Sequence, residues 1–257
     1  MTGPAGQRVV ITAGGGGIGA AMARRFSEAG ARIALCDIDA AAAEAVAVDL
    51  PGAIGLGADV TDETAMDAFF NAAGAHLGGV DVLCANAGTG GPVAPLAEID
   101  LADWRACLSV NLDGAFLACR WAARRMGPQG SGAMILTSST SGLYGVPTRS
   151  PYVTAKWGVI GLMKTLAMEL GPKGVRVNAL CPGAVEGPRM DRVVAAEALA
   201  RQMTEAEVRA LYAEGTSMRS WVTADEIADM ALFLASPAGR HVSGQAIAID
   251  GHTERMT

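Results

Sequence analysis

The chain has 257 residues and a formal net charge of −6, and 51% of its residues are hydrophobic while only 5% are aromatic. This composition excludes a disordered chain, which combines low hydrophobicity with high net charge, and the length fits one large α/β domain. The negative charge disfavours a nucleic-acid partner, and no apolar run approaches the roughly 18 residues of a transmembrane helix, so we expect neither a nucleic-acid nor a membrane partner.

Short β-rich runs alternate with longer helical patterns along the chain. The predicted strands are 8–12, 32–36, 53–56, 80–85, 133–137, 176–180 and 246–249. The predicted helices are 18–29, 40–48, 64–76, 101–126, 152–170 and 224–234. Several strands are apolar throughout, which is typical of strands buried on both faces of a parallel sheet. The pattern predicts an α/β fold, a Rossmann-type doubly wound parallel sheet of about seven strands with helices on both faces.

Local signals mark some helix ends. Asp62 and Asp100 are predicted N-terminal caps, and Gly30, Gly127 and Gly171 are predicted C-terminal stops.

No linker interrupts the pattern, so residues 1–257 are interpreted as one dinucleotide-binding domain. The segment 187–221 is longer than an ordinary connection. Since it follows a strand at the carboxyl edge of the sheet, where such folds bind ligands, we interpret it as a small helical substrate lid rather than a surface excursion.

Cysteine and histidine usage favours neither disulfides nor a metal. The five cysteines form no CxxC pair, and residues 1–7 hold no apolar signal-peptide core. Reduced, buried thiols and a cytoplasmic location are therefore expected. The three histidines lie too far apart for a local ligand motif, so no metal is predicted.

A glycine loop follows the first predicted strand and precedes a helix. Gly14, Gly16 and Gly19 satisfy the GxGxxG pattern, with Gly17 and Ile18 between them. Glycines allow a tight turn and a close approach to a phosphate, and the helix N-terminus offers free N–H groups. The loop therefore predicts a dinucleotide site.

An acid stands where such a site needs one. Asp37 follows Gly19 by 18 residues, and Ile38 comes directly after it. A carboxylate there can bind the ribose hydroxyls and would repel a 2′-phosphate, which favours NAD over NADP. Asp39 strengthens the acidic character. The alternative is that Asp37 is a turn or capping residue.

The third group of residues is catalytic in type. Ser139 follows an apolar strand, Tyr152 comes 13 residues later, and Lys156 lies four residues beyond Tyr152. On a helix Tyr152 and Lys156 share a face, so the ammonium would lower the pKa of the phenol. Such a tyrosine can exchange a proton with an alcohol or carbonyl, while the Ser139 hydroxyl holds the substrate oxygen.

These motifs together resemble the short-chain dehydrogenase/reductase family, in its short single-domain branch, over nearly the whole chain. Thr12, Gly17 and Gly19 match the family's TGxxxGxG loop, with Ala13 in place of its first glycine. In the family, the residues that match Ser139, Tyr152 and Lys156 are catalytic, and the lysine also binds the nicotinamide ribose. The resemblance implies a nicotinamide cofactor and a homo-oligomer, commonly a tetramer.

Further positions acquire roles from the resemblance. It implies adenine contacts from Asp59 and Val60, cofactor contacts from Asn86, Ala87 and Gly88, and a water-mediated proton relay from Asn111 to Lys156. The cofactor-binding set on this reading is Gly14, Gly16, Gly17, Ile18, Gly19, Asp37, Ile38, Asp59, Val60, Asn86, Ala87, Gly88, Tyr152, Lys156, Pro182, Gly183 and Val185. Gly187 stands where the family often has a threonine, a change that favours a more mobile hinge.

The predicted function is an NAD-dependent oxidoreductase that moves a hydride between the nicotinamide and a secondary alcohol or ketone. One alternative is an NADP-dependent ketoreductase of the 3-oxoacyl type, and another is a non-catalytic NAD-sensing regulator. Substrate selection is expected from residues 89–93, 141–150 and the lid. Arg149 and Arg189 could meet a carboxylate or a phosphate, but we expect both to face solvent.

Overall fold

The structure, a computed structural model, describes residues 6–255, with Ala200 described in its backbone only. The ends of the predicted domain, 1–5 and 256–257, lie outside the described residues. The strands are β1 (Arg8–Thr12), β2 (Arg32–Asp37), β3 (Ile54–Gly57), β4 (Val82–Ala85), β5 (Gly132–Thr137), β6 (Val175–Pro182) and β7 (Ala246–Ile249). The α-helices are α1 (Gly17–Glu28), α2 (Ala40–Val48), α3 (Glu63–Leu77), α4 (Leu101–Leu108), α5 (Gly114–Gln129), α6 (Ser150–Leu170), α7 (Pro188–Arg201), α8 (Glu205–Glu214) and α9 (Ala224–Ala235).

The strands form one seven-stranded sheet in the order β3-β2-β1-β4-β5-β6-β7, and every neighbouring pair is parallel. This confirms the predicted α/β fold. The chain builds outward from β1 in one direction and then from β4 in the other. The carboxyl ends of β1 and β4 therefore lie at a topological switch point, where folds of this kind bind ligands.

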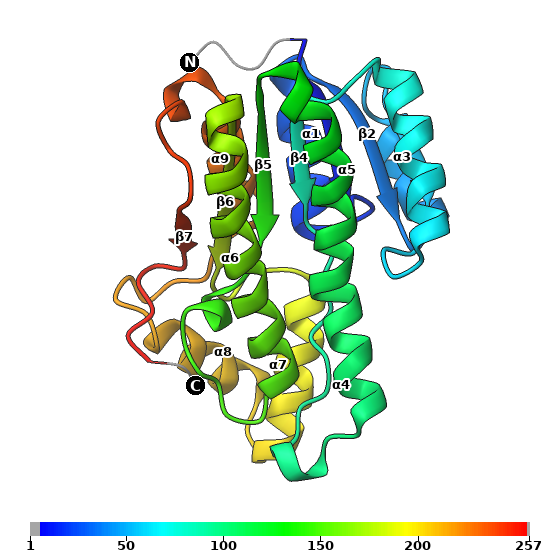
Figure 1. Ribbon diagram of the computed structural model, residues 1–257. Coiled ribbons are helices and arrows are strands. Elements are labelled where there is room, and N and C mark those ends of the chain that lie inside the picture. The colour runs from blue at the N-terminus through cyan, green and yellow to red at the C-terminus, as the bar shows by residue number, and fades with distance from the viewer. Residues whose placement is uncertain (1–5, 256–257) are drawn as a thin grey trace.

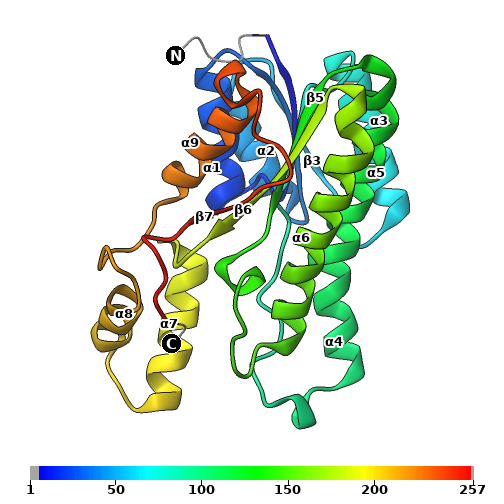
Figure 2. The same cartoon turned by 60° about the vertical axis from the view of Figure 1, so that its left-hand side comes forward.

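Helices cover both faces of the sheet (Figures 1 and 2). The helices α3, α5 and α6 pack on one face, and α1, α2 and α9 pack on the other, which divides the apolar interior into two main clusters. Every residue of the central strands β4 and β5 except Gly132 is buried, because helices shield both sides, and this is why their sequences are apolar without alternation.

The predicted helix 101–126 continues to Gln129 and contains a π-helical segment, η2 (Ser109–Asp113), between α4 and α5. Gly127 is therefore not the stop that we predicted. The helix ends instead at Gly130, which has a φ of 75°, a left-handed conformation that glycine adopts without steric cost.

The structure confirms some of the other predicted helix ends and corrects others. Asp62 caps α3 by accepting hydrogen bonds from the backbone N–H groups of Thr64 and Ala65. Asp100 precedes α4, but its side chain makes no capping bond. The helix α6 ends before Gly171, as predicted, yet Gly171 is right-handed and begins a 3₁₀ turn, so the left-handed residue is Gly174.

The segment 187–221 forms α7 and α8, which lie beyond the carboxyl edge of the sheet (Figure 2). It has a small apolar core of its own around Val194 and Val208. The Trp221 ring packs 5.7 Å from the ring of Tyr212, and its Nε1 donates to the backbone oxygen of Arg209. These contacts make the segment an ordered helical pair.

All five cysteines are buried and unpaired, as predicted. Burial raises the pKa of the Cys36, Cys84 and Cys119 thiols to about 12, which makes them poor nucleophiles at neutral pH. No helix among the described residues is both long enough and apolar enough to cross a membrane. A cytoplasmic location stays a prediction.

Candidate active site

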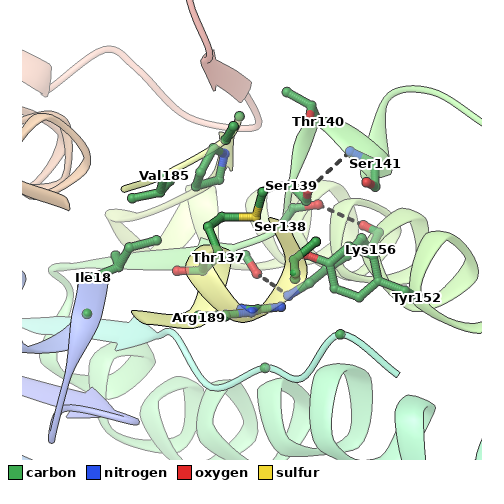
Figure 3. A pocket seen from close by; sticks show the side chains of 18 of the residues that line it. Ile18, Thr137, Ser138, Ser139, Thr140, Ser141, Tyr152, Lys156, Val185 and Arg189 are labelled. Carbon is green, nitrogen blue, oxygen red and sulfur yellow. Dashed lines mark hydrogen bonds between the residues drawn. The ribbon is translucent and has the colours of Figure 1, made fainter. Parts of the chain in front are cut away.

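A cavity of about 530 Å³ opens at the carboxyl edge of the sheet, a volume typical of ligand sites. Its walls come from the ends of β1, β2, β4, β5 and β6, from α6 and from the α7–α8 segment. Figure 3 shows Ser139, Tyr152 and Lys156 on one side of it and Ile18 on another. The predicted site residues that line it are Gly16, Gly17, Ile18, Asp37, Asn86, Gly88, Ser139, Tyr152, Lys156, Pro182, Gly183 and Val185.

Seven predicted site residues do not line this cavity: Gly14, Gly19, Ile38, Asp59, Val60, Ala87 and Asn111. Ile38 is 75% exposed on the surface. Asp59 and Val60 follow β3 close to the end of β2, because Ala58 N donates to Asp37 O at 2.8 Å. One carboxylate oxygen of Asp59 accepts from the Thr61 N–H and hydroxyl.

The glycine loop contains two kinds of glycine. A Cβ on Gly19 would stand 2.0 Å from the Ala13 carbonyl oxygen, and one on Gly14 would stand 2.7 Å from Leu35 Cβ. The close packing at these two positions therefore leaves no room for a side chain. A Cβ on Gly16 or Gly17 would meet no atom within 4 Å. These two glycines therefore leave open space at the N-terminus of α1, where a phosphate is attracted by free N–H groups.

The substitution of alanine for glycine at position 13 has a structural consequence. Ala13 adopts a φ of 52°, in the left-handed region where a Cβ carries a steric cost. The backbone at Ala13 thus keeps a conformation that suits glycine, although alanine carries a Cβ.

Asp37 makes the local contacts of a turn residue and also lines the cavity. One carboxylate oxygen accepts from Gly15 N at 3.0 Å, and the other accepts from Asp39 N at 3.1 Å. The side chain thus holds the glycine loop against the end of β2 while it also lines the cavity. Asp39 caps α2 through a bond from Ala42 N, so its role is structural.

The ends of β1 and β4 are joined by side chains. Thr12 Oγ1 accepts from the backbone N–H groups of Asn86 and Ala87, at 3.0 and 3.2 Å. Asn86 Nδ2 donates to the carbonyl oxygens of Thr12 and Ala13. Asn86 therefore supports the glycine loop from the neighbouring strand.

Tyr152 and Lys156 project from the first turns of α6 into the cavity (Figure 3). Lys156 is only 2% exposed, and its Nζ donates to the Thr137 carbonyl oxygen at 2.9 Å and lies 5.6 Å from the centre of the Tyr152 ring. Ser138 donates its hydroxyl to the Lys156 carbonyl oxygen at 2.9 Å, which ties β5 to α6. Both Ser138 and Ser139 line the cavity, but the Ser138 hydroxyl is used in this bond between the two elements.

The surroundings of Tyr152 favour its phenolate form. Burial by itself raises the pKa of the phenol, but the positive charges of Lys156 and Arg189, the Ser139 hydroxyl and Arg149 together outweigh it, so the pKa lies below its ordinary value. Burial lowers the pKa of Lys156, and the charge of Tyr152 opposes this shift. With its pKa lowered, Tyr152 releases its proton more readily than an ordinary phenol, as a proton-exchanging group requires.

Asn111 lies behind this pair, in the π-helical segment η2. Its Nδ2 donates to the carbonyl oxygens of Thr89 and Cys107, whereas its Oδ1 is buried without a partner among the described residues. A Cβ on Gly88 would stand 2.8 Å from that oxygen and 3.1 Å from Lys156 Nζ. Asn111 Oδ1 and Lys156 Nζ therefore lie on the same side of Gly88, which has no side chain to separate them.

The sequence alone did not locate several cavity residues. Arg149 and Arg189, which we expected to face solvent, both line the cavity beside Tyr152, although Arg189 is also exposed. Thr253 and Arg255 line it as well, because the Asp250 carboxylate accepts from the N–H and hydroxyl of Thr253 and turns the chain toward the cavity. An Asp followed three residues later by Thr is a weak local signal for such a turn.

A parallel sheet of this order, with a glycine loop at its switch point and an acid at the end of the neighbouring strand β2, defines a protein of the Rossmann class. The family model described as Enoyl-(Acyl carrier protein) reductase matches residues 12–252. The solved structure of NAD⁺-bound xylitol dehydrogenase matches with a TM-score of 0.91 and 30% identity, over 96% of this chain and 98% of that chain.

Two sequence relatives also match over nearly the full length of both chains. Cis-4-hydroxycyclohexanecarboxylate dehydrogenase of Sinomonas cyclohexanicum is 38% identical over 94% of both chains. D-threitol dehydrogenase of Mycolicibacterium smegmatis is 34% identical, over 96% of this chain and 92% of the relative. The chain belongs to the short-chain dehydrogenase/reductase family, a family of oxidoreductases, which confirms the resemblance seen in its motifs.

Proposed function

We propose that the protein is an NAD-dependent oxidoreductase that transfers a hydride between the nicotinamide and a secondary alcohol or ketone. The observation that carries this proposal is the buried Tyr152–Lys156 pair, with a lowered phenol pKa, on the wall of the cavity that the open glycines also line. Both sequence relatives named above are dehydrogenases of hydroxylated compounds, which supports the same class.

The residues around the cavity fit a dinucleotide. Gly16 and Gly17 leave room at the N-terminus of α1 for a pyrophosphate, and Asp37 offers a carboxylate to the ribose hydroxyls. Pro182, Gly183 and Val185 would hold the nicotinamide end. When bound, the nicotinamide supplies the hydride acceptor for alcohol oxidation.

The protein's own residues handle the proton. Tyr152, as a phenolate, takes the proton from the alcohol hydroxyl, and the Ser139 hydroxyl holds the substrate oxygen as its charge changes. Lys156 stabilises the phenolate through its ammonium group and is proposed to bind the nicotinamide ribose. Its bond to the Thr137 carbonyl oxygen keeps that ammonium in place.

We further propose that Asn111 connects Lys156 to solvent through water. Its Oδ1 is a buried acceptor that no described protein group satisfies, and it lies on the same side of Gly88 as Lys156 Nζ. A buried polar group of this kind is usually satisfied by water. The π-helical segment that carries Asn111 is a distortion common at functional sites.

NAD is favoured over NADP by the charge at the glycine loop. Cavity residues at that end are Ala13, Gly16, Gly17, Ile18 and Asp37, which provide one carboxylate and no basic group. A 2′-phosphate would be repelled there. The same charge argues against the NADP-dependent 3-oxoacyl ketoreductase, and the activated tyrosine argues against a non-catalytic NAD sensor.

The α7–α8 segment is proposed to act as the substrate lid of a single domain. Gly187, Met190 and Tyr212 bring it into the cavity wall. For the oligomer, the exposed apolar side chains of Phe116 on α5 and Trp157 on α6 support a packing surface between copies. Light scattering that gives a tetramer mass would support the homotetramer, and a monomer would contradict it.

Cofactor and proton carrier are tested together on a panel of secondary alcohols with NAD and NADP in parallel. We expect NAD reduction that Tyr152→Phe abolishes while NADH binding, followed by fluorescence, is retained. Tyr144→Phe is the matched control, because Tyr144 does not line the cavity. Near-normal turnover in Tyr152→Phe would refute the proton role.

The cofactor preference is tested by Asp37→Ala, which we expect to weaken NAD binding and to relax the bias against NADP. The control is Asp39→Ala, which removes the cap of α2 and costs roughly 0.5–2 kcal/mol of stability without changing the preference. A preference that is unchanged in Asp37→Ala would limit Asp37 to holding the glycine loop.

A further inference from the structure

Two arginines stand beside Tyr152 in the cavity. The guanidinium carbon of Arg149 lies 5.0 Å from the centre of the Tyr152 ring, and that of Arg189 lies 6.0 Å from it. Arg149 comes from the turn before α6 and Arg189 from the first turn of α7. Figure 3 shows Arg189 next to Tyr152 and Lys156. Two separate segments of the chain therefore bring positive charge to one place.

Neither arginine is neutralised by an acid within the part of the chain that the structure describes. No ion pair involves either of them there. Arg149 donates one bond, from Nη2 to the Gly90 carbonyl oxygen at 3.1 Å, and its Nε is buried without a partner. Glu186 lines the same cavity but forms no ion pair with Arg189. Arg149 is half-buried and Arg189 is exposed, but the Arg149 Nε is buried and lacks a partner, and a buried polar group usually has one. Together with the two unpaired charges, this favours an anion from outside the chain.

Arg149 is held in place by the loops around it. Thr148, just before it, has a φ of 63°, a strained conformation for a β-branched residue that concentrates at functional sites. The Thr148 carbonyl oxygen accepts from Ala94 N at 3.0 Å. The Arg149 guanidinium is joined to the neighbouring loop by its bond to the Gly90 carbonyl oxygen.

The end of the cavity around Tyr152 is positively charged, whereas the chain as a whole is negatively charged. The protein has a formal net charge of −6, yet Arg149, Lys156 and Arg189 gather around Tyr152. The acid expected to bind the adenosine ribose, Asp37, is the last residue of β2, whereas the arginines flank the tyrosine at α6 and α7. The basic residues of the cavity lining outnumber its two carboxylates, Asp37 and Glu186, and such an excess attracts ligands of the opposite sign.

We propose that the substrate alcohol carries a compact anionic group, a carboxylate or a sulfonate, which Arg149 and Arg189 hold a few bonds from the carbon that is oxidised. Guanidinium groups bind such oxyanions with paired donors in a fixed geometry. This inference rests on the proposed function and specifies the substrate class of the same site. The two arginines thereby orient the alcohol toward Tyr152.

The test compares secondary alcohols of one shape that differ in charge. The probes are 4-hydroxycyclohexanecarboxylate, 4-hydroxycyclohexanesulfonate and the uncharged 4-hydroxycyclohexanecarboxamide, titrated into the complex of the protein with NADH, where an alcohol is not oxidised. We expect at least one anion to bind about 10–100-fold more tightly than the amide, as charge-assisted hydrogen bonds predict. Which anion binds better distinguishes a carboxylate substrate from a sulfonate one.

Variants assign the preference to its residues. Arg149→Gln and Arg189→Gln should each bring the anion-to-amide ratio close to one. Arg192→Gln, on the exposed surface of α7 and outside the cavity, should keep the wild-type ratio. Binding does not depend on turnover, so the result is independent of the role of Tyr152.

Titration with NADH comes first in every variant and separates this inference from the proposed function. A wild-type protein that does not bind NADH would refute the proposed cofactor. With NADH bound, equal binding of anion and amide, or no binding of either anion, overturns the inference. Arginine variants that weaken NADH binding and keep the ratio would assign the arginines to the dinucleotide and overturn it as well.

Discussion

Alanine substitutions in the glycine loop separate the role of packing from the role of ligand binding. Gly16 has an extended backbone with a φ of −167°, and a Cβ there would meet nothing within 4 Å. Gly16→Ala should therefore leave the melting temperature unchanged. The new methyl group would stand in the cavity where the pyrophosphate is proposed to lie, so we expect NADH affinity to fall roughly tenfold or more, about 1.4 kcal/mol.

Gly19→Ala, by contrast, should lower the melting temperature. Its Cβ would stand 2.0 Å from the Ala13 carbonyl oxygen and 2.8 Å from Asn86 Nδ2, and the backbone oxygen cannot move without disturbing the loop. Overpacking typically costs about 1–3 kcal/mol, and the upper value corresponds to a fall in melting temperature of roughly 6–12 °C. Gly55→Ala is the control, because its Cβ would clash equally, 2.1 Å from the Ala43 oxygen, but outside the cavity.

Thermal unfolding and NADH fluorescence titration, measured on all three variants, read the two roles independently. Gly55→Ala should be destabilised yet bind NADH normally at a temperature where it is folded. The reasoning is refuted if Gly16→Ala binds NADH as tightly as the wild type, or if it melts as early as Gly19→Ala.

The remaining predictions concern the tyrosine and two backbone positions. Burial raises the pKa of Tyr152, whereas the charges of Lys156 and Arg189 lower it. Arg189→Gln should therefore raise that pKa and move the rising limb of the pH profile of kcat/KM for alcohol oxidation to higher pH. A limb that does not move would contradict this. Gly187, with φ 130° and ψ 176°, occupies a region nearly exclusive to glycine, so Gly187→Thr should cost about 1–3 kcal/mol in thermal unfolding. Ala13→Gly should relieve about 1 kcal/mol and raise the melting temperature by roughly 2–4 °C.

Much of the fold could be predicted from local sequence. The strand β5 is buried on both faces, so its residues had to be apolar throughout, and this made it visible. Tyr152 and Lys156 lie on one helix, where a spacing of four determines a shared face. The glycine loop, Asp37 and Ser139 lie at the carboxyl ends of parallel strands, which all reach one edge of the sheet. These motifs therefore predicted the family, and most of the predicted site residues line one cavity.

What the sequence alone could not determine depends on contacts between distant segments. Arg149 and Arg189 are forty residues apart in the chain, and no local pattern distinguishes an arginine that faces solvent from one that faces a cavity. Thr253 reaches the same cavity only through the turn made by Asp250. Tertiary packing brings these segments together, because the carboxyl ends of parallel strands converge on one edge and place their following loops around a common space.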